Sequence, residues 1–327
     1  MATLPEQSQP TVDAIYEAYE EDQESGFRYH LGASLIGVEC KRSLWYSFRW
    51  ATISQFKGRM LRLFQTGHLA EARFVADLRR IGVTVHDHEY IDPDKYAEDY
   101  DKPVKQIGVR DEFGHFGGSL DGMAVGFIEA PKTWHVCEFK THNEKSFAKL
   151  KIEGVLKSKP RHYAQMQVYM HLIGATRSFY MAVNKNNDEL YRERIEYDVD
   201  YAMRLIAKAS EVVTSPTPPK KISNDPSWSG CKGLGGGAYR CDHYDVCHGG
   251  AVPDRHCRSC LHSTPIEGGL WHCGLRDDWQ LSREDQEKGC DKHLYIPGLI
   301  PAEQVDSTGN TITYIYPDGT EWIDGKQ

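Results

Sequence analysis

Two acidic residues and a lysine are grouped in two short segments near the middle of the sequence. The first segment, residues 117–122, ends in Asp121 and Gly122, and the second, residues 135–140, contains Glu138 and Lys140. Residues two apart on a strand face the same side, so Glu138 and Lys140 project together, and Asp121 joins them if its strand pairs with theirs. Carboxylate oxygens bind hard divalent cations, and a lysine can orient water or stabilise charge on a phosphate. The spacing therefore indicates metal-assisted phosphoryl chemistry, although a Glu-x-Lys pair also occurs on ordinary solvated strands.

Two predicted helices place further polar side chains within reach of these strands. Glu71 lies on a long helix predicted over residues 55–80, where apolar residues recur at helical spacing, and His68 lies one turn earlier. Gln165 and Tyr169 are four residues apart, on one face of a helix predicted over residues 160–174. The sequence thus predicts a third carboxylate from one helix and an amide–phenol pair from another.

The order of these motifs resembles that of the PD-(D/E)XK nuclease superfamily, in its RecB-like and lambda-exonuclease-like branch. The motifs are Gly67-x-x-x-Glu71, Gly-x-Leu-Asp121-Gly, Glu138-Phe-Lys140 and Gln165-x-x-x-Tyr169, within about residues 30–200. The resemblance implies an α/β, restriction-endonuclease-like core with a central mixed sheet flanked by helices.

The same resemblance implies roles for the residues in these motifs. Asp121 and Glu138 would bind Mg²⁺ or Mn²⁺, Lys140 would be the catalytic lysine, and the pair on the later helix would position DNA or that lysine. Lambda-exonuclease-like members carry a glutamate in the first motif and many RecB-like members a histidine. Glu71 is therefore the expected third ligand, and His68 is a second candidate.

The pattern of Cys257-x-x-Cys260, Cys273 and Cys290 is typical of a structural zinc site with four thiolates. His272 or His293 could replace one of these thiolates. Residues 227–293 hold seven of the nine cysteines and few aliphatic side chains, so this module is expected to need a metal for its stability. Cys137 alternates away from Glu138 and is expected to be a buried core thiol.

A second set of cysteines consists of Cys40, Cys231, Cys241 and Cys247. In RecB-like nucleases, one N-terminal and three C-terminal cysteines surround an iron–sulfur cluster, and the resemblance implies such a clasp here. Nine residues separate Cys231 from Cys241, where the family commonly has two. The set could therefore hold a [4Fe–4S] cluster or a second zinc, with His243 or His248 able to replace a thiolate.

The chain is expected to divide into five parts. These are an acidic N-terminal arm (1–24), the nuclease core (25–220), the cysteine clasp (221–250), the zinc-binding module (251–298) and a C-terminal β-hairpin (299–327). Within the core, we predict a helix over residues 34–50 with Ser34 as its N-cap and a helix over 199–214. Predicted strands cover residues 83–90, 115–127, 133–140, 178–184 and 189–197.

Composition limits the possible functions. The chain of 327 residues has a net charge of −8 and a pI of about 6.0, so nucleic-acid contacts must use local cationic surfaces. Such surfaces are predicted around residues 41–62 and in a loop around residues 145–161. The sequence has no apolar run long enough for a membrane span and no secretory signal, so we expect a cytoplasmic protein, in the host cytoplasm if it is phage-encoded.

The functional prediction is a metal-dependent DNA exonuclease that acts in recombination, repair or replication, as phage and prokaryotic recombination nucleases do. Its expected partners are DNA ends, single- or double-stranded, and a single-strand-annealing or recombination protein. Two alternatives are open: a structure-specific endonuclease with the same site, and a zinc-containing DNA- or protein-binding adaptor with a vestigial site.

Overall fold

The computed structural model of the chain describes residues 9–23, 26–89, 105–232, 240–275 and 280–325. Most of the predicted insertion between Cys231 and Cys241 lies outside the described residues, as do the ends of the N-terminal arm and Tyr90 of the predicted strand over residues 83–90.

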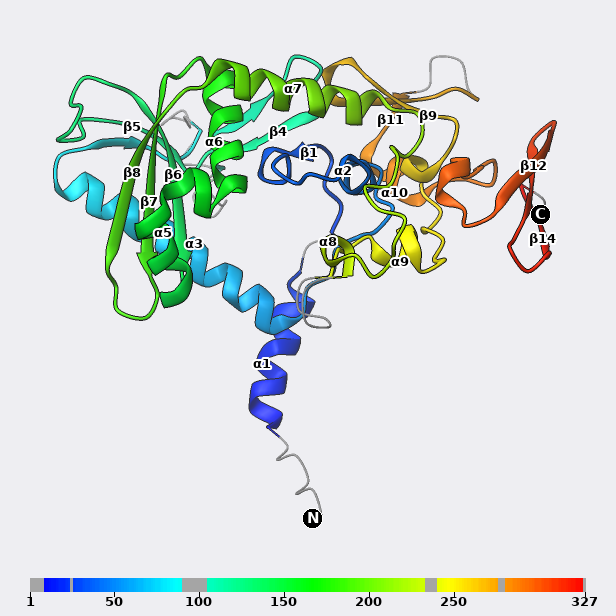
Figure 1. Cartoon of the computed structure of the whole chain (residues 1–327), viewed down its shortest axis with the longest axis horizontal. Coiled ribbons are helices and arrows are strands. Elements are labelled where there is room, and N and C mark those ends of the chain that lie inside the picture. The colour runs from blue at the N-terminus through cyan, green and yellow to red at the C-terminus, as the bar shows by residue number, and fades with distance from the viewer. Residues whose placement is uncertain (1–8, 24–25, 90–104, 233–239, 276–279, 326–327) are drawn as a thin grey trace, which may run out of the picture.

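A five-stranded mixed sheet carries the motif that contains Glu138 and Lys140 (Figure 1). Its strands, in spatial order, are β2 (Thr84–His86), β5 (Gly122–Val125), β6 (His135–His142), β7 (Arg177–Asn184) and β8 (Leu190–Glu196). β6 and β7 are parallel, and all other neighbours are antiparallel. The predicted central mixed sheet is therefore confirmed.

Helices cover both faces of this sheet. On one face, α3 (Gly58–Arg80) buries Phe74, Val75 and Leu78 against a layer that includes Cys137 and Phe139. On the other face lie α5 (Glu144–Ser158) and α6 (Pro160–Ile173). Because neighbouring residues of a strand face opposite sides, Glu138 and Lys140 belong to the α6 side. Cys137 is fully buried on the α3 side, which confirms the prediction of a core thiol.

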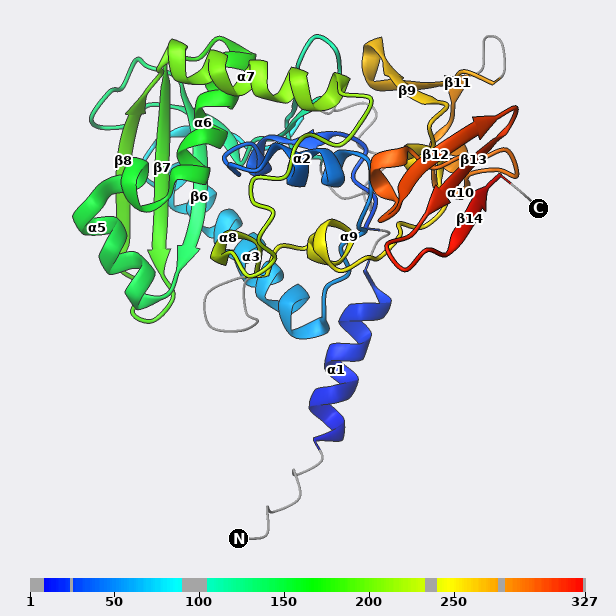
Figure 2. The ribbon, with the colours of Figure 1, turned by 45° about the vertical axis from the view of Figure 1, so that its right-hand side comes forward.

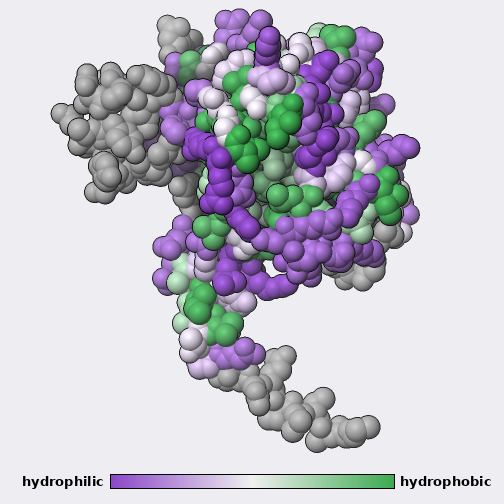
Figure 3. All heavy atoms as spheres, turned by 90° about the vertical axis from the view of Figure 1, so that its left-hand side faces the viewer, coloured by the Kyte–Doolittle hydropathy of each residue, from purple (hydrophilic) through white to green (hydrophobic). Residues whose placement is uncertain are grey.

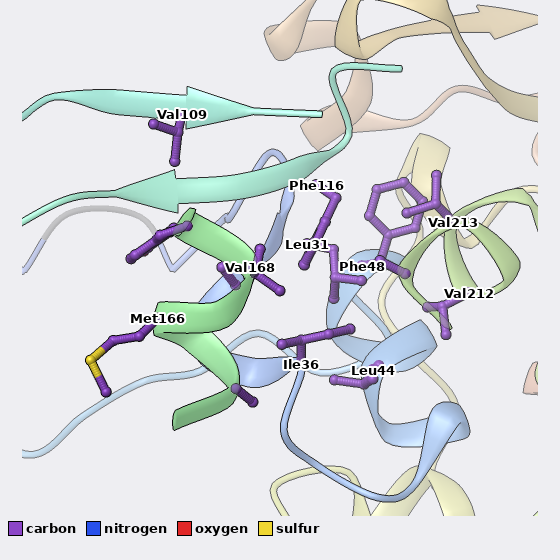
Figure 4. Close-up of a cluster of buried hydrophobic side chains, with 14 of the residues drawn as sticks. Leu31, Ile36, Leu44, Phe48, Val109, Phe116, Met166, Val168, Val212 and Val213 are labelled. Atoms are coloured by element: carbon purple, nitrogen blue, oxygen red, sulfur yellow. The ribbon is translucent and has the colours of Figure 1, made fainter. Parts of the chain in front are cut away.

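The larger core extends from α6 to a second sheet. This sheet has the order β1 (Leu31–Gly32), β4 (Phe116–Ser119), β3 (Gly108–Arg110), and it packs with α2 (Lys41–Phe48) and α7 (Val199–Thr214). Figure 4 shows Val168 on the side of α6 that faces Leu31 of β1 and Phe116 of β4, whereas Met166 points away from them. The predicted helix over residues 199–214 is confirmed.

Three predicted elements differ in the structure. The helix predicted over residues 34–50 is a 3-10 turn, Ala33–Leu35, followed by α2. Its predicted N-cap, Ser34, was wrong, because α2 is capped by Cys40, whose Sγ accepts a hydrogen bond from the Ser43 amide. The chain between them passes close to the start of α6, where a Cβ on Gly37 would lie 2.9 Å from the Arg161 Cα. Tertiary packing therefore breaks a segment whose local pattern is helical.

The other two differences concern the neighbourhood of the motifs. The strand predicted over residues 115–127 is two strands, β4 and β5, which belong to different sheets and are separated at Leu120 and Asp121. The lysine-rich segment predicted as a loop contains α5, whose N-terminus is capped by Asn143. Its apolar residues Phe147 and Leu150 are buried at helical spacing, a periodicity that the high lysine content obscured.

The cysteine-rich and C-terminal segments form two small sheets at the opposite end of the molecule from the central sheet (Figure 2). The first consists of β9 (Ser263–Ile266), β10 (Leu270–Cys273) and β11 (Gln280–Leu281). Two short helices, α8 (Ser229–Lys232) and α9 (Tyr244–His248), precede it in the chain, and α10 (Arg283–Lys288) follows it. The second consists of β12 (Glu303–Thr308), β13 (Thr311–Ile315) and β14 (Glu321–Asp324). The antiparallel pairing of β13 with β14 confirms the predicted hairpin, to which β12 adds a third strand.

The N-terminal helix α1 (Pro10–Glu21) projects away from the sheets and contacts the beginning of α3. The Gly58 amide donates a hydrogen bond of 2.8 Å to Oε1 of Glu20. Figure 3 shows hydrophobic side chains on the surface of α1, where Val12 and Ile15 are exposed. The predicted acidic arm is thus helical over most of its described length.

Arg258 joins the cysteine-rich segment to the core. Its guanidinium is 1% exposed and lies over the rings of Trp50 and Trp271, 4.0 and 4.5 Å from their centroids. It donates hydrogen bonds to the backbone carbonyls of Phe48 and Tyr29. A buried arginine held by aromatic rings and carbonyls fixes two surfaces to each other through directional contacts.

Replacing Arg258 with leucine is expected to lower the free energy of unfolding by about 3 kcal/mol. The substitution leaves the carbonyl oxygens without their donors and removes the cation from the aromatic rings. Chemical denaturation of the purified protein measures the change, with Arg204→Leu, which removes an exposed arginine of α7, as the control. Equal stability of the two variants would show that Arg258 does not hold these segments together.

Candidate active site

The junction between β4 and β5 brings Asp121 to the charged face of β6. β5 pairs with β6 in the register Gly122↔Cys137, which places the preceding Asp121 beside Glu138. The Phe139 amide donates a hydrogen bond of 2.7 Å to Oδ2 of Asp121, and Lys140 Nζ donates one of 3.3 Å to the same oxygen. Lys140 Nζ also lies 2.5 Å from Oε1 of Glu138. The structure therefore brings Asp121, Glu138 and Lys140 together, as the strand pattern predicted.

Glu138 is the most unusual group of this cluster. Its side chain is 0% exposed; Oε1 is paired with the Lys140 ammonium at 2.5 Å, and Oε2 has no partner among the described residues. Burial raises the pKa of Glu138 to about 8, with Lys140 opposing the shift and Asp121 adding to it. For Lys140, burial acts to lower the pKa, but attraction to the two carboxylates outweighs it, so the pKa is raised. A buried carboxylate without hydrogen bonds is costly unless a cation compensates it.

Glu71 of α3 interacts electrostatically with this cluster. Burial raises the pKa of Glu71 to about 7, with the nearby charge of Asp121 adding to the shift and Lys140 opposing it. These interactions show that Glu71 shares the electrostatic environment of the strand residues. His68, one turn earlier, is exposed, and no contact with the carboxylates is seen among the described residues. The structure therefore groups Glu71, and not His68, with Asp121 and Lys140.

Gln165 and Tyr169 of α6 line the same cluster. Gln165 Nε2 donates a hydrogen bond of 3.4 Å to the Tyr169 hydroxyl, and both side chains are buried. Burial, followed by the negative charge of Glu138, raises the pKa of Tyr169. A Cβ on Gly118 of β4 would lie 2.3 Å from the Tyr169 hydroxyl oxygen, so this close approach requires glycine at position 118.

The donor set suits a hard divalent cation by its chemistry. Asp121 and Glu138 contact the Lys140 ammonium, Glu71 interacts electrostatically with it, and oxygen ligands of this kind bind Mg²⁺ and Mn²⁺. Oε2 of Glu138, which has no partner among the described residues, is available as a ligand. Among the described residues, no group of three or more acidic, histidine or cysteine side chains is already arranged around a metal position. Binding would therefore require these side chains to adjust, starting with Lys140, which lies between two of the carboxylates.

The thiols of Cys257, Cys260, Cys273 and Cys290 also interact with one another. Burial raises the pKa of Cys257 to about 12, and the other three thiols add to the shift. The amide of Cys260 donates a hydrogen bond of 3.1 Å to the carbonyl of Cys257, which makes the Cys-x-x-Cys segment a tight turn. All four cysteines are free thiols. The predicted set is thus gathered, although the described side chains are not arranged as a formed metal site.

The thiols of the second set also interact with one another, although Cys40 is far from the other three in the sequence. Burial raises the pKa of Cys231, and Cys241, Cys247 and Cys40 add to the shift in that order. The Cys241 amide donates a hydrogen bond of 2.9 Å to the Cys231 carbonyl, so the long spacing between these cysteines does not separate them. His243, a possible substitute ligand, already contacts Ser47 Oγ through Nε2 at 2.9 Å.

A polar cluster next to the site was missed by the sequence analysis. His142 follows Glu138 and Lys140 on the same face of β6, and it meets Tyr180 of β7 and His162 of α6. The alternation of Glu138, Lys140 and His142 is a signal that could have included His142. Tyr180 and His162 lie on other elements, and no local sequence pattern indicated that they would join this cluster.

Comparisons with known proteins give limited information. No protein-family model matches the sequence, and no curated protein matches it. Among solved structures, the chain is similar to an alkaline exonuclease, LHK-Exo, from Laribacter hongkongensis, with 17% identity, a TM-score of 0.38, and coverage of 61% of this chain and 89% of that chain.

Two further structures give similar values. A complex of LHK-Exo with dAMP matches with 18% identity and a TM-score of 0.39, covering 61% of this chain and 89% of that one. A protein designated SSO0001 matches with 12% identity and a TM-score of 0.37, covering 73% and 97%. Such scores do not establish a family, so the functional argument depends on the site itself. Within the part of the chain that the structure describes, no helix is long and apolar enough to cross a membrane.

Proposed function

We propose that the protein is a divalent-metal-dependent deoxyribonuclease, and specifically an exonuclease that processes DNA ends. The observation that supports this most strongly is the buried Glu138 carboxylate, which pairs with Lys140 through one oxygen, leaves the other without a partner among the described residues, and lies beside Asp121. Desolvated carboxylates next to a lysine are a combination that costs stability and is typical of functional sites. This costly arrangement argues against one of the two alternatives, the adaptor with a vestigial site, because DNA or protein binding alone does not require it.

In the proposed reaction, each residue has a separate role. Glu138, Asp121 and Glu71 would hold Mg²⁺ or Mn²⁺, which when bound supplies positive charge to the phosphate and lowers the pKa of water. The Lys140 ammonium, fixed by Asp121 and by the Phe139 carbonyl, would stabilise the negative charge that develops on the phosphate during hydrolysis. Tyr169 and Gln165 would form the wall that positions the DNA strand against these groups.

The decisive experiment is incubation of end-labelled single- and double-stranded DNA with the protein in Mg²⁺, Mn²⁺ or EDTA. We expect mononucleotides or short oligonucleotides that accumulate from one end, and no products in EDTA. Discrete internal fragments would instead identify an endonuclease with the same site. DNA binding without any metal-dependent product would contradict the proposed activity. A recombination or annealing partner protein stays a prediction that co-purification can test.

The two cysteine sets are proposed to have structural roles. The Cys257 set gathers four thiols whose ionised forms would repel one another, and a zinc ion removes this repulsion. The Cys40 set connects the N-cap of α2 to the segment after α7, and we propose that it holds a [4Fe–4S] cluster or a second zinc. Both metals would stabilise the fold and take no part in the hydrolysis.

DNA affinity is expected to fall steeply with salt despite the acidic composition, because α5 presents exposed lysines beyond the end of β6. Replacing Lys145, Lys149 and Lys157 together with glutamine should reduce the slope of log K against log salt by about two. Fluorescence anisotropy with a labelled oligonucleotide measures the slope, and Lys132→Gln is the control for loss of an exposed lysine elsewhere. An unchanged slope in the triple variant would remove α5 from the DNA-binding surface.

A further inference from the structure

A buried polar cluster lies on the α6 side of the central sheet, next to Lys140. Tyr180 is the register partner of Glu138 on the neighbouring strand, and its side chain is fully buried. Its hydroxyl lies 2.9 Å from Nε2 of His142 and 3.0 Å from Nδ1 of His162. Side chains from β6, β7 and α6 therefore meet at one hydroxyl group.

The cluster continues to the start of α5. Nδ1 of His142 lies 3.2 Å from Ser146 Oγ, which accepts a hydrogen bond of 2.6 Å from Lys159 Nζ. Because lysine can only donate, the Ser146 proton is available for Nδ1 of His142. We therefore assign the single ring proton of the neutral His142 to Nε2, from which it is donated to Tyr180. The Tyr180 hydroxyl then donates to His162, so every bond in the chain has one donor and one acceptor.

The cluster is electrostatically coupled to Lys140. Burial, followed by the charge of Lys140, lowers the pKa of His162 to about 3, and burial with Lys159 and Lys140 lowers that of His142 to about 4. Both rings are therefore neutral, as the chain of hydrogen bonds requires. The residue directly opposite Lys140 on β7 is the small Ala182, and Tyr180 and His142 are polar side chains that precede Ala182 on β7 and follow Lys140 on β6, on the same face.

Folding alone gives no reason for this arrangement. The surrounding α6 side of the sheet is packed with apolar residues such as Val168 and Ala182. A buried polar network costs desolvation and is stable only when each member is satisfied, but it then fixes its side chains more rigidly than apolar packing does. Lysine has a flexible four-carbon stem, so a rigid neighbour restricts where its ammonium group can go.

We propose that His142, Tyr180 and His162 form a positioning network that holds the Lys140 ammonium against Asp121 and Glu138. The proposal deepens the proposed nuclease function and depends on it for its role in hydrolysis. None of the three residues touches the reacting phosphate in this scheme. They act through Lys140, because the hydrogen bonds among them keep the side chains near its ammonium group in fixed positions.

The first test uses variants that preserve volume and remove hydrogen bonds. Tyr180→Phe should lower kcat for DNA cleavage by about tenfold with KM changed by less than about twofold, because the lysine is misplaced after the substrate has bound. His162→Leu should have the same effect. His162→Asn, which keeps a polar atom near the position of Nδ1, should restore most of the rate. Wild-type kcat in a folded Tyr180→Phe protein, as judged by its thermal melting, would overturn the proposal.

The second test does not depend on nuclease activity. An acetylating reagent labels lysine amines, and mass spectrometry compares the labelling rate of Lys140 with that of the exposed Lys132 in the same sample. Tyr180→Phe should increase the relative labelling of Lys140 by at least about fivefold, since a released ammonium group reaches solvent more often. An unchanged ratio would show that the network does not hold Lys140. If the wild type cleaves no DNA but the ratio rises, the proposed function fails while the positioning role remains.

Discussion

Glu138→Gln is expected to reduce metal-dependent DNA cleavage by at least about a hundredfold. The amide keeps the size of the side chain and its place on β6, but it removes the negative charge that a divalent cation needs. DNA binding depends on surfaces away from this buried group and should change by less than about twofold. Cleavage of end-labelled DNA and anisotropy binding measurements on the same preparation give the two values.

Glu189→Gln is the matched control for this substitution. It makes the same chemical change at an exposed position beside β8, where the carboxylate pairs with Lys151 at 2.5 Å. We expect the control to cleave DNA at the wild-type rate. If Glu138→Gln also cleaves near that rate, Glu138 has no role in hydrolysis, and the argument from its buried carboxylate is lost.

The second large effect is expected from the Cys257 set. Replacing Cys257 and Cys260 together with serine should release about one zinc per chain and lower the free energy of unfolding by more than about 3 kcal/mol. The cysteine-rich segment has short strands and little aliphatic core, so we expect its stability to depend on the proposed zinc ion. Elemental analysis measures the zinc, and limited proteolysis should show new cleavage within residues 251–295. Cys137→Ala, which removes a thiol from neither set, should keep the wild-type metal content.

The Cys40 set is expected to respond differently. Cys40→Ser keeps a side chain that can cap α2 but removes the thiolate of the proposed metal link to the chain after α7, so thermal melting of the whole core should shift to a lower temperature. Absorbance near ~400 nm in the wild type, lost in this variant, would identify an iron–sulfur cluster, whereas a colourless protein with zinc in both sets would identify a second zinc site. A wild-type protein without tightly bound metal after anaerobic purification would contradict both metal proposals.

The sequence alone was sufficient for features that depend on local periodicity. The alternation of residues along β6 placed Glu138 and Lys140 on one face and Cys137 on the other, because a strand has no other way to direct its side chains. The helical spacing of α3 and α7 and the turn between β13 and β14 were likewise readable, since each is determined by residues close together in the chain.

Features that depend on packing between distant segments were decided only by the tertiary structure. The same local pattern that predicted a helix over residues 34–50 is broken where Gly37 passes α6, and the strand containing Asp121 changes from one sheet to another. The electrostatic grouping of Glu71 with Asp121 and Lys140, and the exposure of His68, depend on how α3 is rotated against the sheet, which periodicity does not specify to within one turn.

The cluster around Tyr180 shows the physical reason most clearly. Its three members lie on β6, β7 and α6, and a hydrogen bond requires their polar atoms to meet within about 3 Å. Sequence patterns specify the direction of each side chain relative to its own helix or strand. The distances between side chains on different elements depend on strand register and helix packing, and these are determined by the core as a whole.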